Sequence, residues 1–327
     1  LADRAPVIEG LPGALDDSAP DAWGRNLITR RLAAQARDVG HPAPTATDLD
    51  YLLGVHDGTR QGALRFCRDD GMPFLAESGE VPQLLELEAL LDAARQVVDD
   101  RDADDAVAAL LAAGSGSLGG ARPKASVADR DVLHIAECGL RTPAHRLVTI
   151  GATPVLLVER FDRSGQQRIP YLSARSLIGA ATGSGSDYLE LVEGITQHGS
   201  AVTTDLIELW RRIAFSIAIN NTDDHLRNHA LLRDPGGWRL SPIFDVNPNP
   251  NLATPRATSI AGATTTDGCR QALFASAAHF GLDQDAAEIN WHQIVSVVTR
   301  WRTAAFRNGI PEDAHRQFVS ALDRWAS

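Results

Sequence analysis

Cysteine pairs and long apolar runs are both missing from this sequence. Its three cysteines, Cys67, Cys138 and Cys269, are odd in number and far apart, so they predict neither a disulfide framework nor a paired zinc motif. We therefore expect a reducing, cytoplasmic location. No run of about 18 apolar residues occurs, and the first residues do not resemble a signal peptide, so we expect no membrane span. The first residue is Leu1 rather than Met, which fits a gene product longer than this chain.

Positive charge is also scarce. Asp and Glu outnumber Lys and Arg by 42 to 31, which gives a net charge of −11. Proteins that bind nucleic acid directly usually carry a basic stripe. The charge balance therefore disfavours direct binding of DNA or RNA.

The length of 327 residues predicts two domains or one large two-lobed unit, because single cores stop growing near ~250–300 residues. Strand-like patterns occur at residues 62–66, 146–148 and 154–158, all in the first half. The second half is mainly helical. We predict an α+β fold with a mixed αβ N-terminal lobe over residues 1–163 and a mainly α-helical C-terminal lobe over residues 164–327.

Apolar residues recur at helical spacing in two places, and each predicts a helix with one face in a core. In the first half they are Leu84, Leu87, Leu91, Ala94 and Val98, with a second helix over residues 105–113. In the second half they are Leu206, Leu209, Ile213 and Ile217. Asp205 and Glu208 resemble a capping box at the start of that later helix.

The most informative segment is residues 220–228, with the sequence NNTDDHLRN, at the end of that helix. It places Asp223 and Asn228 five positions apart, and a predicted hairpin then leads to Asp245 on an apolar run. Protein-kinase catalytic loops use this layout for a base that accepts the substrate hydroxyl proton and for two metal ligands. Oxygen ligands suit Mg²⁺. The pattern predicts ATP- and Mg²⁺-dependent phosphoryl transfer, with Asp223 as base and Asn228 and Asp245 on the metal.

The neighbouring residues allow other interpretations. A polar turn after a helix would use Asp and Asn as well, but the joint spacing favours the kinase. His225 could contact a phosphate or fix the loop by a hydrogen bond. We expect Asp224 to be solvated or to cap a helix. A metallohydrolase built on Asp223, Asp224 and His225 ranks low, because no second cluster with ligand spacing accompanies them.

Two further segments could complete a nucleotide site. Residues 114–121, GSGSLGGA, could bring backbone N–H groups close to phosphates, although such tracts are more often linkers. Lys124 could stabilise a phosphate or lie on an exposed strand. Residues 155–163, VLLVERFDR, fit a kinase hinge or an ordinary core strand with a charged exit.

Four segments taken together resemble HipA-type serine/threonine kinases, the toxins of bacterial type II toxin–antitoxin pairs. They are residues 21–25 (DAWGR), 117–124 (SLGGARPK), 158–163 (VERFDR) and 221–228 (NTDDHLRN). The resemblance covers most of the chain in the right order. It implies a two-lobed protein-kinase-like fold, with ATP and Mg²⁺ as cofactors.

The resemblance also assigns roles residue by residue. It implies that Asp223 is the catalytic base, that Asn228 and Asp245 are the Mg²⁺ ligands, and that Ser117 is an autophosphorylation site that switches the kinase off. It implies an ATP site made of Gly119, Gly120, Ala121, Lys124, Glu159, Phe161, Asp162 and His225. In that site backbone groups of Glu159 and Phe161 would read adenine, and Asp162 would meet the ribose.

The partners that the resemblance implies are proteins. The target class is the aminoacyl-tRNA synthetases, and the antitoxin is a small helix-turn-helix protein. The complex with that antitoxin, rather than this acidic chain, would read operator DNA.

One departure from the family supports alternatives. The stretch between Lys124 and Gly139 is short and holds no lysine, whereas such kinases have a strand lysine there that pairs with the ATP phosphates. A pseudokinase that binds the antitoxin as a corepressor is one alternative. A small-molecule kinase is another, since sugar and choline-type kinases share the Asp, Asn and Asp arrangement.

Overall fold

The computed structural model describes residues 10–76, 86–99, 103–113, 139–151, 153–180 and 185–326. The chain divides into two compact units. The first takes its described residues from Leu1–Asp131, Val148–Val155 and Asp162–Leu172, and the second from Val132–Leu147, Leu156–Phe161 and Ser173–Ser327. Within the described residues, no helix combines the length and the apolar character that crossing a membrane requires.

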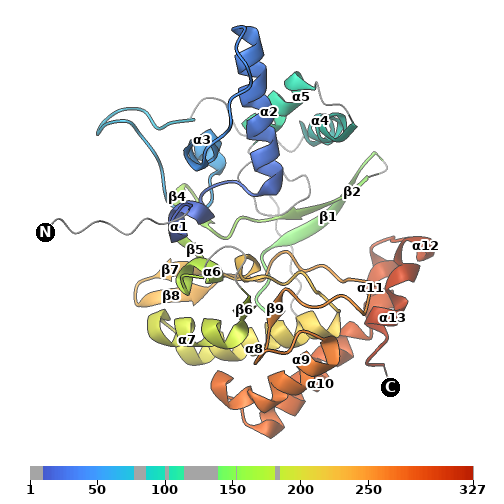
Figure 1. Cartoon of the computed structure of the whole chain (residues 1–327). Helices are drawn as coiled ribbons and strands as arrows, with labels where there is room; N and C mark the ends of the chain where they lie inside the picture. The colour runs from blue at the N-terminus through green and yellow to red at the C-terminus, as the bar shows by residue number, and fades with distance from the viewer. Residues whose placement is uncertain are drawn as a thin grey trace, which may run out of the picture. The chain divides into compact units, whose positions relative to one another are not determined.

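Helices form most of the first unit (Figure 1). They are α1 (Gly13–Asp17), α2 (Ala22–Asp38), α3 (Asp48–Gly54), η1 (Asp57–Thr59), α4 (Leu87–Asp99) and α5 (Asp104–Ala112). Asp21 caps α2 by accepting a hydrogen bond from the Gly24 N–H, which satisfies a donor at the helix start. Helices α2, α4 and α5 share a core that includes Leu27, Val97 and Leu110.

Short strands connect the helical parts of the chain. They are β1 (His145–Ile150), β2 (Thr153–Val158), β3 (Arg163–Ser164), β4 (Gln167–Arg168) and β5 (Tyr171–Ser173). Strands β1 and β2 form a two-stranded sheet, and β3 pairs antiparallel with β4.

The second unit is mainly helical. Its elements are α6 (Ala174–Leu177), β6 (Ser186–Asp187), α7 (Tyr188–His198), α8 (Val202–Ala218), η3 (Leu226–Asn228), β7 (Ala230–Asp234), β8 (Gly237–Leu240), β9 (Thr258–Ser259), α9 (Thr266–Ala275), η4 (Ala277–Phe280), α10 (Gln284–Val298), α11 (Trp301–Arg307), α12 (Glu312–His315), η5 (Arg316–Phe318) and α13 (Val319–Leu322). Strands β7 and β8 form an antiparallel hairpin, and β6 pairs with β9 in parallel.

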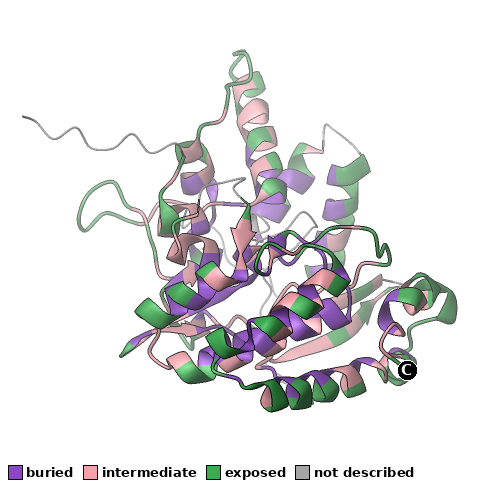
Figure 2. Cartoon of the chain, turned by 60° about the horizontal axis from the view of Figure 1, so that its bottom comes forward, coloured by how far each residue is buried: buried purple, intermediate pink, exposed green. Residues whose placement is uncertain are grey.

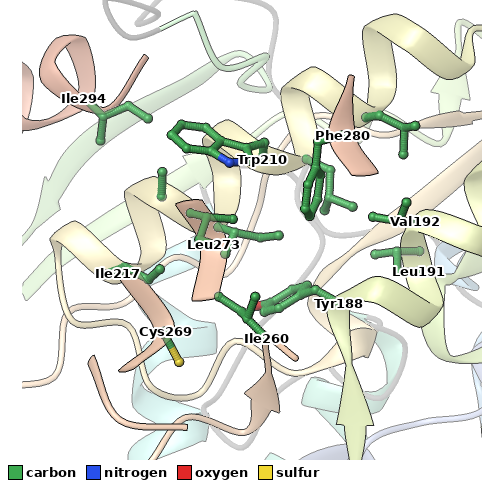
Figure 3. Packing of buried hydrophobic residues seen from close by; sticks show 14 of the residues in the cluster. Tyr188, Leu191, Val192, Trp210, Ile217, Ile260, Cys269, Leu273, Phe280 and Ile294 are labelled. Carbon is green, nitrogen blue, oxygen red and sulfur yellow. The ribbon is translucent and has the colours of Figure 1, made fainter. Parts of the chain in front are cut away.

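Helix α8 is the centre of this unit and packs against α7, α9, α10 and η4. It contributes Leu209, Trp210, Ile213 and Ile217, all fully buried, to a core that the neighbouring helices complete. Figure 3 shows part of this core, which includes the Tyr188 ring, Ile217 and other buried apolar side chains. The helices carry buried residues on one face and exposed residues on another (Figure 2).

Several predicted elements are confirmed. The helix predicted over residues 105–113 is α5, and the strands predicted at 146–148 and 154–158 lie within β1 and β2. The predicted face of the later helix, Leu206, Leu209, Ile213 and Ile217, is buried along α8. The hairpin after residue 228 is formed by β7 and β8.

Two local predictions are wrong, and a third is only partly right. Residues 62–66 form no strand, because Gly62 has a left-handed backbone (φ +73°) and its N–H donates to Asp162 instead of a neighbouring strand. In α4, Leu87 and Ala94 are buried as predicted, but Val98 is 66% exposed and Leu90 and Val97 are buried instead, so the predicted face is only partly right; Leu84 lies outside the described residues. The proposed capping box is also wrong, as the next subsection explains.

Candidate functional site

Helix α8 ends in a way that directs the chain into the predicted catalytic loop. Asn220 has a left-handed backbone (φ +57°), a conformation that Asn tolerates better than most residues. Its N–H donates to Ile217 O at 3.1 Å, and the Asn221 N–H donates to Ser216 O at 2.8 Å. These two bonds make a Schellman motif, which satisfies the last carbonyls of the helix. The sequence therefore ends the helix at Ala218, five positions before Asp223.

Asp224 is buried at the start of the loop, and four polar side chains surround its carboxylate. Tyr188 and Ser216 donate to Oδ2 at 2.5 and 2.7 Å, and His229 Nε2 donates to Oδ1 at 3.0 Å. A guanidinium nitrogen of Arg256 lies 3.6 Å from Oδ2. Burial would raise the pKa of the Asp224 carboxyl, but His229, Arg256 and Tyr188 outweigh burial and hold that pKa well below its usual range. The prediction that Asp224 is solvated is wrong.

Asp223 and Asn228 lie on the same loop with different degrees of exposure. Asp223 is exposed, whereas Asn228 is buried. The Asn228 side-chain nitrogen donates to the Asp223 carbonyl at 3.1 Å. Because this bond uses Nδ2, the amide oxygen of Asn228 is the atom left to bind a metal ion. The loop thus presents a free carboxylate and an oriented amide oxygen.

The segment that carries Asp245 runs alongside this loop and is held at both ends. At one end the Ser241 N–H donates to Ala230 O at 2.8 Å, just after the loop. At the other end Asn249 Nδ2 donates to Thr222 Oγ1 at 2.7 Å, just before the loop. Asp245 lies midway between these anchors. The two anchors therefore tie the ends of the Asp245 segment to residues on either side of the loop that carries Asp223 and Asn228.

Asn220 and Asn249 strengthen the second anchor by reciprocal bonds. The Asn249 N–H donates to Asn220 O at 3.0 Å, and Asn220 Nδ2 donates to Asn249 O at 2.7 Å. Thr266 Oγ1 donates to Asn220 Oδ1 at 3.0 Å. We call the set Asn220, Thr222 and Asn249 the asparagine clasp. It joins the end of α8 to the segment that carries Asp245.

Buried carboxylates of α8 support the anchor at Ser241. Asp205 and Glu208 both accept hydrogen bonds from Arg141, and Glu208 also accepts from Arg212. Arg212 in turn donates to the carbonyl of Ser241. The capping-box prediction failed because α8 begins at Val202, so these carboxylates lie inside the helix and bind arginines from distant parts of the chain.

Asp245 itself has an unusual backbone. Its φ is +54°, in the left-handed region that a non-glycine residue seldom adopts and that is often found at functional sites. Asn247 Nδ2 donates to Asp245 Oδ1 at 3.0 Å. The neighbouring Phe244 ring packs against Phe161 with 5.5 Å between centroids. This ring contact places the predicted adenine-binding segment beside the segment that carries Asp245.

The donor set fits Mg²⁺. Among the described residues, no three His, Cys, Asp or Glu side chains form a group that could hold a metal ion. Asn228 and Asp245 offer an amide oxygen and a carboxylate. Mg²⁺ in nucleotide sites is commonly held by one or two carboxylates together with substrate phosphates and water. The two residues can therefore serve as the protein's share of such a site.

Comparison with known proteins identifies the family. Residues 131–301, more than half of the chain, match the HipA-like C-terminal domain. The chain belongs to this family. A comparison with curated protein sequences gives no match.

A solved structure shows the same kind of fold for this HipA-like chain. The HipA of Shewanella oneidensis MR-1, in a toxin–antitoxin complex with HipB and operator DNA, superposes with a TM-score of 0.60 at 13% identity, covering 95% of this chain and 90% of that chain. The Helicobacter pylori proinflammatory kinase CtkA gives a TM-score of 0.38 at 15% identity, covering 58% of this chain and 78% of that chain. The predicted kinase-like α+β fold is confirmed.

The other residues predicted to form the nucleotide site lie in the second unit, in the first unit, or outside the described residues. Glu159 and Phe161 lie in the second unit, and the Glu159 N–H already donates to Ala144 O at 2.7 Å, which leaves its carbonyl as the group for a ligand. His225 is half-buried, and its backbone N–H donates to Asp223 O at 2.9 Å. Asp162 belongs to the first unit, is buried and accepts from Gly62 N–H at 2.8 Å. Ser117, Gly119, Gly120, Ala121 and Lys124 lie outside the described residues.

Sequence reasoning missed Tyr188 and Arg256, which contact Asp224 from separate elements, and His229, which contacts it from the other end of the loop. Tyr188 lies 36 positions before Asp224 and contacts it as a buried hydroxyl at the start of α7. No local spacing links Tyr188 or Arg256 to Asp224. One sequence signal for a buried network was available. A second Asp stands directly beside the predicted base, and a solvated loop does not require that second carboxylate.

Proposed function

We propose that this HipA-like chain is an ATP- and Mg²⁺-dependent serine/threonine protein kinase that inhibits growth as a toxin. The observation that supports this most is the pairing of two segments. Bonds at Ala230 and Thr222 tie the two ends of the Asp245 segment to residues on either side of the loop of Asp223 and Asn228. An exposed carboxylate and two oxygen ligands on adjacent segments are the parts that phosphoryl transfer requires.

The residues of the second unit have distinct roles in this proposal. Asp223 accepts the proton of the attacking hydroxyl, since it is the exposed carboxylate of the loop. Asn228 and Asp245 hold Mg²⁺, which when bound neutralises charge on the phosphates. Carbonyl and amide groups near Glu159 and Phe161 contact adenine, and His225 lies near the phosphates.

A transfer assay tests this function. The chain is incubated with Mg²⁺, labelled ATP and a cell extract, and label is followed in protein and in metabolites. We expect label in protein at Ser or Thr, and we expect Asp223→Ala to lower transfer at least ~100-fold, because the base acts directly on the reacting hydroxyl. Growth inhibition on expression should disappear with the same substitution.

Other outcomes of that assay contradict the proposal. Label in a metabolite alone would indicate a small-molecule kinase. ATP binding without transfer would indicate a pseudokinase that acts as a corepressor. Full transfer by the Asp223→Ala variant would remove Asp223 from the role of base.

The partners follow from family likeness. The Shewanella HipA was solved with HipB and operator DNA. We propose a small HipB-like helix-turn-helix antitoxin for this chain, with DNA contacted through the antitoxin, and an aminoacyl-tRNA synthetase as the class of target. The net charge of −11 supports an indirect route to DNA. Co-purification with the antitoxin and labelling of a synthetase in the extract test these two points.

A further inference from the structure

A buried side-chain bond joins the two ends of the catalytic loop. His229 Nε2 donates to Asp224 Oδ1 at 3.0 Å, and the two side chains are 3% and 8% exposed. Asp223 directly precedes Asp224, and Asn228 directly precedes His229. The bonded pair therefore consists of the immediate neighbours of the proposed base and of a proposed metal ligand.

The rest of the second unit fixes both members of this pair. The Asp224 carbonyl accepts from Thr258 Oγ1 at 2.8 Å, in addition to the bonds to its carboxylate. The His229 carbonyl accepts from the Ala174 N–H at 2.7 Å, and its ring meets the edge of the Tyr188 ring at 5.5 Å between centroids. The side-chain bond therefore links two backbone positions that the rest of the unit also holds, and it adds a second connection across the loop beside the bond from Asn228 Nδ2 to Asp223 O.

We propose that Asp224 and His229 are a positioning pair that sets the separation of Asp223 and Asn228. Both are buried, so neither reaches the reacting atoms, and they act through the residues beside them. The inference rests on the proposed kinase function. Misplacement of a catalytic group by about 1 Å can lower a rate ~100-fold, whereas binding of the nucleotide depends less on the position of the base. The pair should therefore matter more for kcat than for nucleotide affinity.

Three substitutions separate positioning from stability. His229→Phe removes the bond to Asp224 and keeps an aromatic ring against Tyr188. His229→Gln keeps a side-chain N–H that can donate to Asp224. Tyr188→Phe is the matched control, since it removes a different bond to the same carboxylate and leaves the bond across the loop intact. For each variant, kcat, KM for ATP, the Kd of ATP with Mg²⁺ and the free energy of unfolding are measured.

We expect His229→Phe to lower kcat roughly 10- to 100-fold while the Kd changes less than about threefold. His229→Gln should recover most of the lost kcat. Tyr188→Phe should lower the free energy of unfolding with a change in kcat below about threefold, because the loop ends stay joined. If His229→Phe does not fold, Asp224→Asn, which keeps the size of the side chain and weakens the bond, takes its place.

The results that overturn the inference are distinct from those that overturn the function. An unchanged kcat in His229→Phe would show that the pair is purely structural. The same conclusion would follow if, in every variant, the loss of kcat were proportional to the loss in free energy of unfolding. In both cases the kinase function would stand. A wild-type chain that transfers no phosphate would overturn the proposed function, and this inference with it.

Discussion

At the scale of single residues, Asp224 is held by four polar side chains in the described part of the second unit. It is a buried carboxylate, and its folded-state pKa is lowered relative to the unfolded chain, where Asp titrates near ~3.9. A lowered folded-state pKa means that the unfolded state binds protons more readily. Asp224 therefore adds stability above about pH 4, and this contribution is lost as the pH falls toward the folded-state pKa.

The first prediction concerns Asp224→Asn. At pH 7 this substitution should lower the free energy of unfolding by about 3 kcal/mol, since it breaks a buried network of charged groups. The difference from wild type should shrink as the pH falls below about 4, where the wild-type carboxyl begins to take up a proton on unfolding. Urea unfolding at several pH values measures both effects. A difference that does not change with pH would contradict the assignment of Asp224 as the ionised centre.

Asn220 provides a second prediction at this scale. Its left-handed backbone costs an Ala side chain roughly 1 kcal/mol or more, whereas glycine adopts it freely. Asn220→Ala and Asn220→Gly both lose the side-chain bonds to residues 249 and 266. Asn220→Ala should therefore be less stable than Asn220→Gly by about 1 kcal/mol in urea unfolding. Equal stability of the two variants would show that backbone strain has no role here.

At the scale of elements, the site depends on two segments that are held side by side. Helix α8 and the β7–β8 hairpin fix one end, and the asparagine clasp fixes the other. Neither segment alone would fix the position of its proposed metal-binding residue, Asn228 or Asp245. The ends of the loop and the Asp245 segment have little regular structure of their own. The clasp is therefore an outer support of the proposed metal site.

The prediction for the clasp compares Asn249→Ala with Asn251→Ala. Asn249 Nδ2 binds Thr222, whereas the Asn251 side chain accepts a bond from the nearby Ala253 N–H in its own segment. Loss of an outer support typically weakens metal binding by ~10-fold or more. We expect Asn249→Ala to raise the Mg²⁺ concentration for half-maximal ATP binding roughly tenfold, with little change in Asn251→Ala. Equal Mg²⁺ dependence in both variants would contradict the role of the clasp.

Local patterns predicted elements well where the element is stabilised by its own apolar face. The face of α8 and the hairpin of β7 and β8 follow from periodicity and turn residues. The capping box on Asp205 and Glu208 failed because their partners include Arg141, more than 60 positions away. A buried ion pair leaves no local signal that distinguishes it from a helix cap.

At the scale of the whole molecule, the order of motifs predicted the kinase-like fold, and the family match agrees with it. The proposed catalytic residues remain a prediction, which rests on the spacing of Asp223 and Asn228 that phosphoryl transfer uses. The network around Asp224 was not, since Tyr188 and Arg256 come from separate elements and meet only in the folded chain. Local spacing thus nominated the residues that we propose to act, whereas the side chains that hold them became visible only in the folded chain.

The measurement that tests the central claim most directly is calorimetric titration of ATP into the chain with and without Mg²⁺. The account predicts that wild type and Asp223→Ala bind ATP with Mg²⁺ alike, and that Asp245→Asn weakens this binding at least ~10-fold because a metal ligand loses its charge. Without Mg²⁺ the three proteins should bind equally weakly. ATP binding that does not depend on Mg²⁺, or that Asp245→Asn leaves unchanged, would contradict a metal and nucleotide site at these residues.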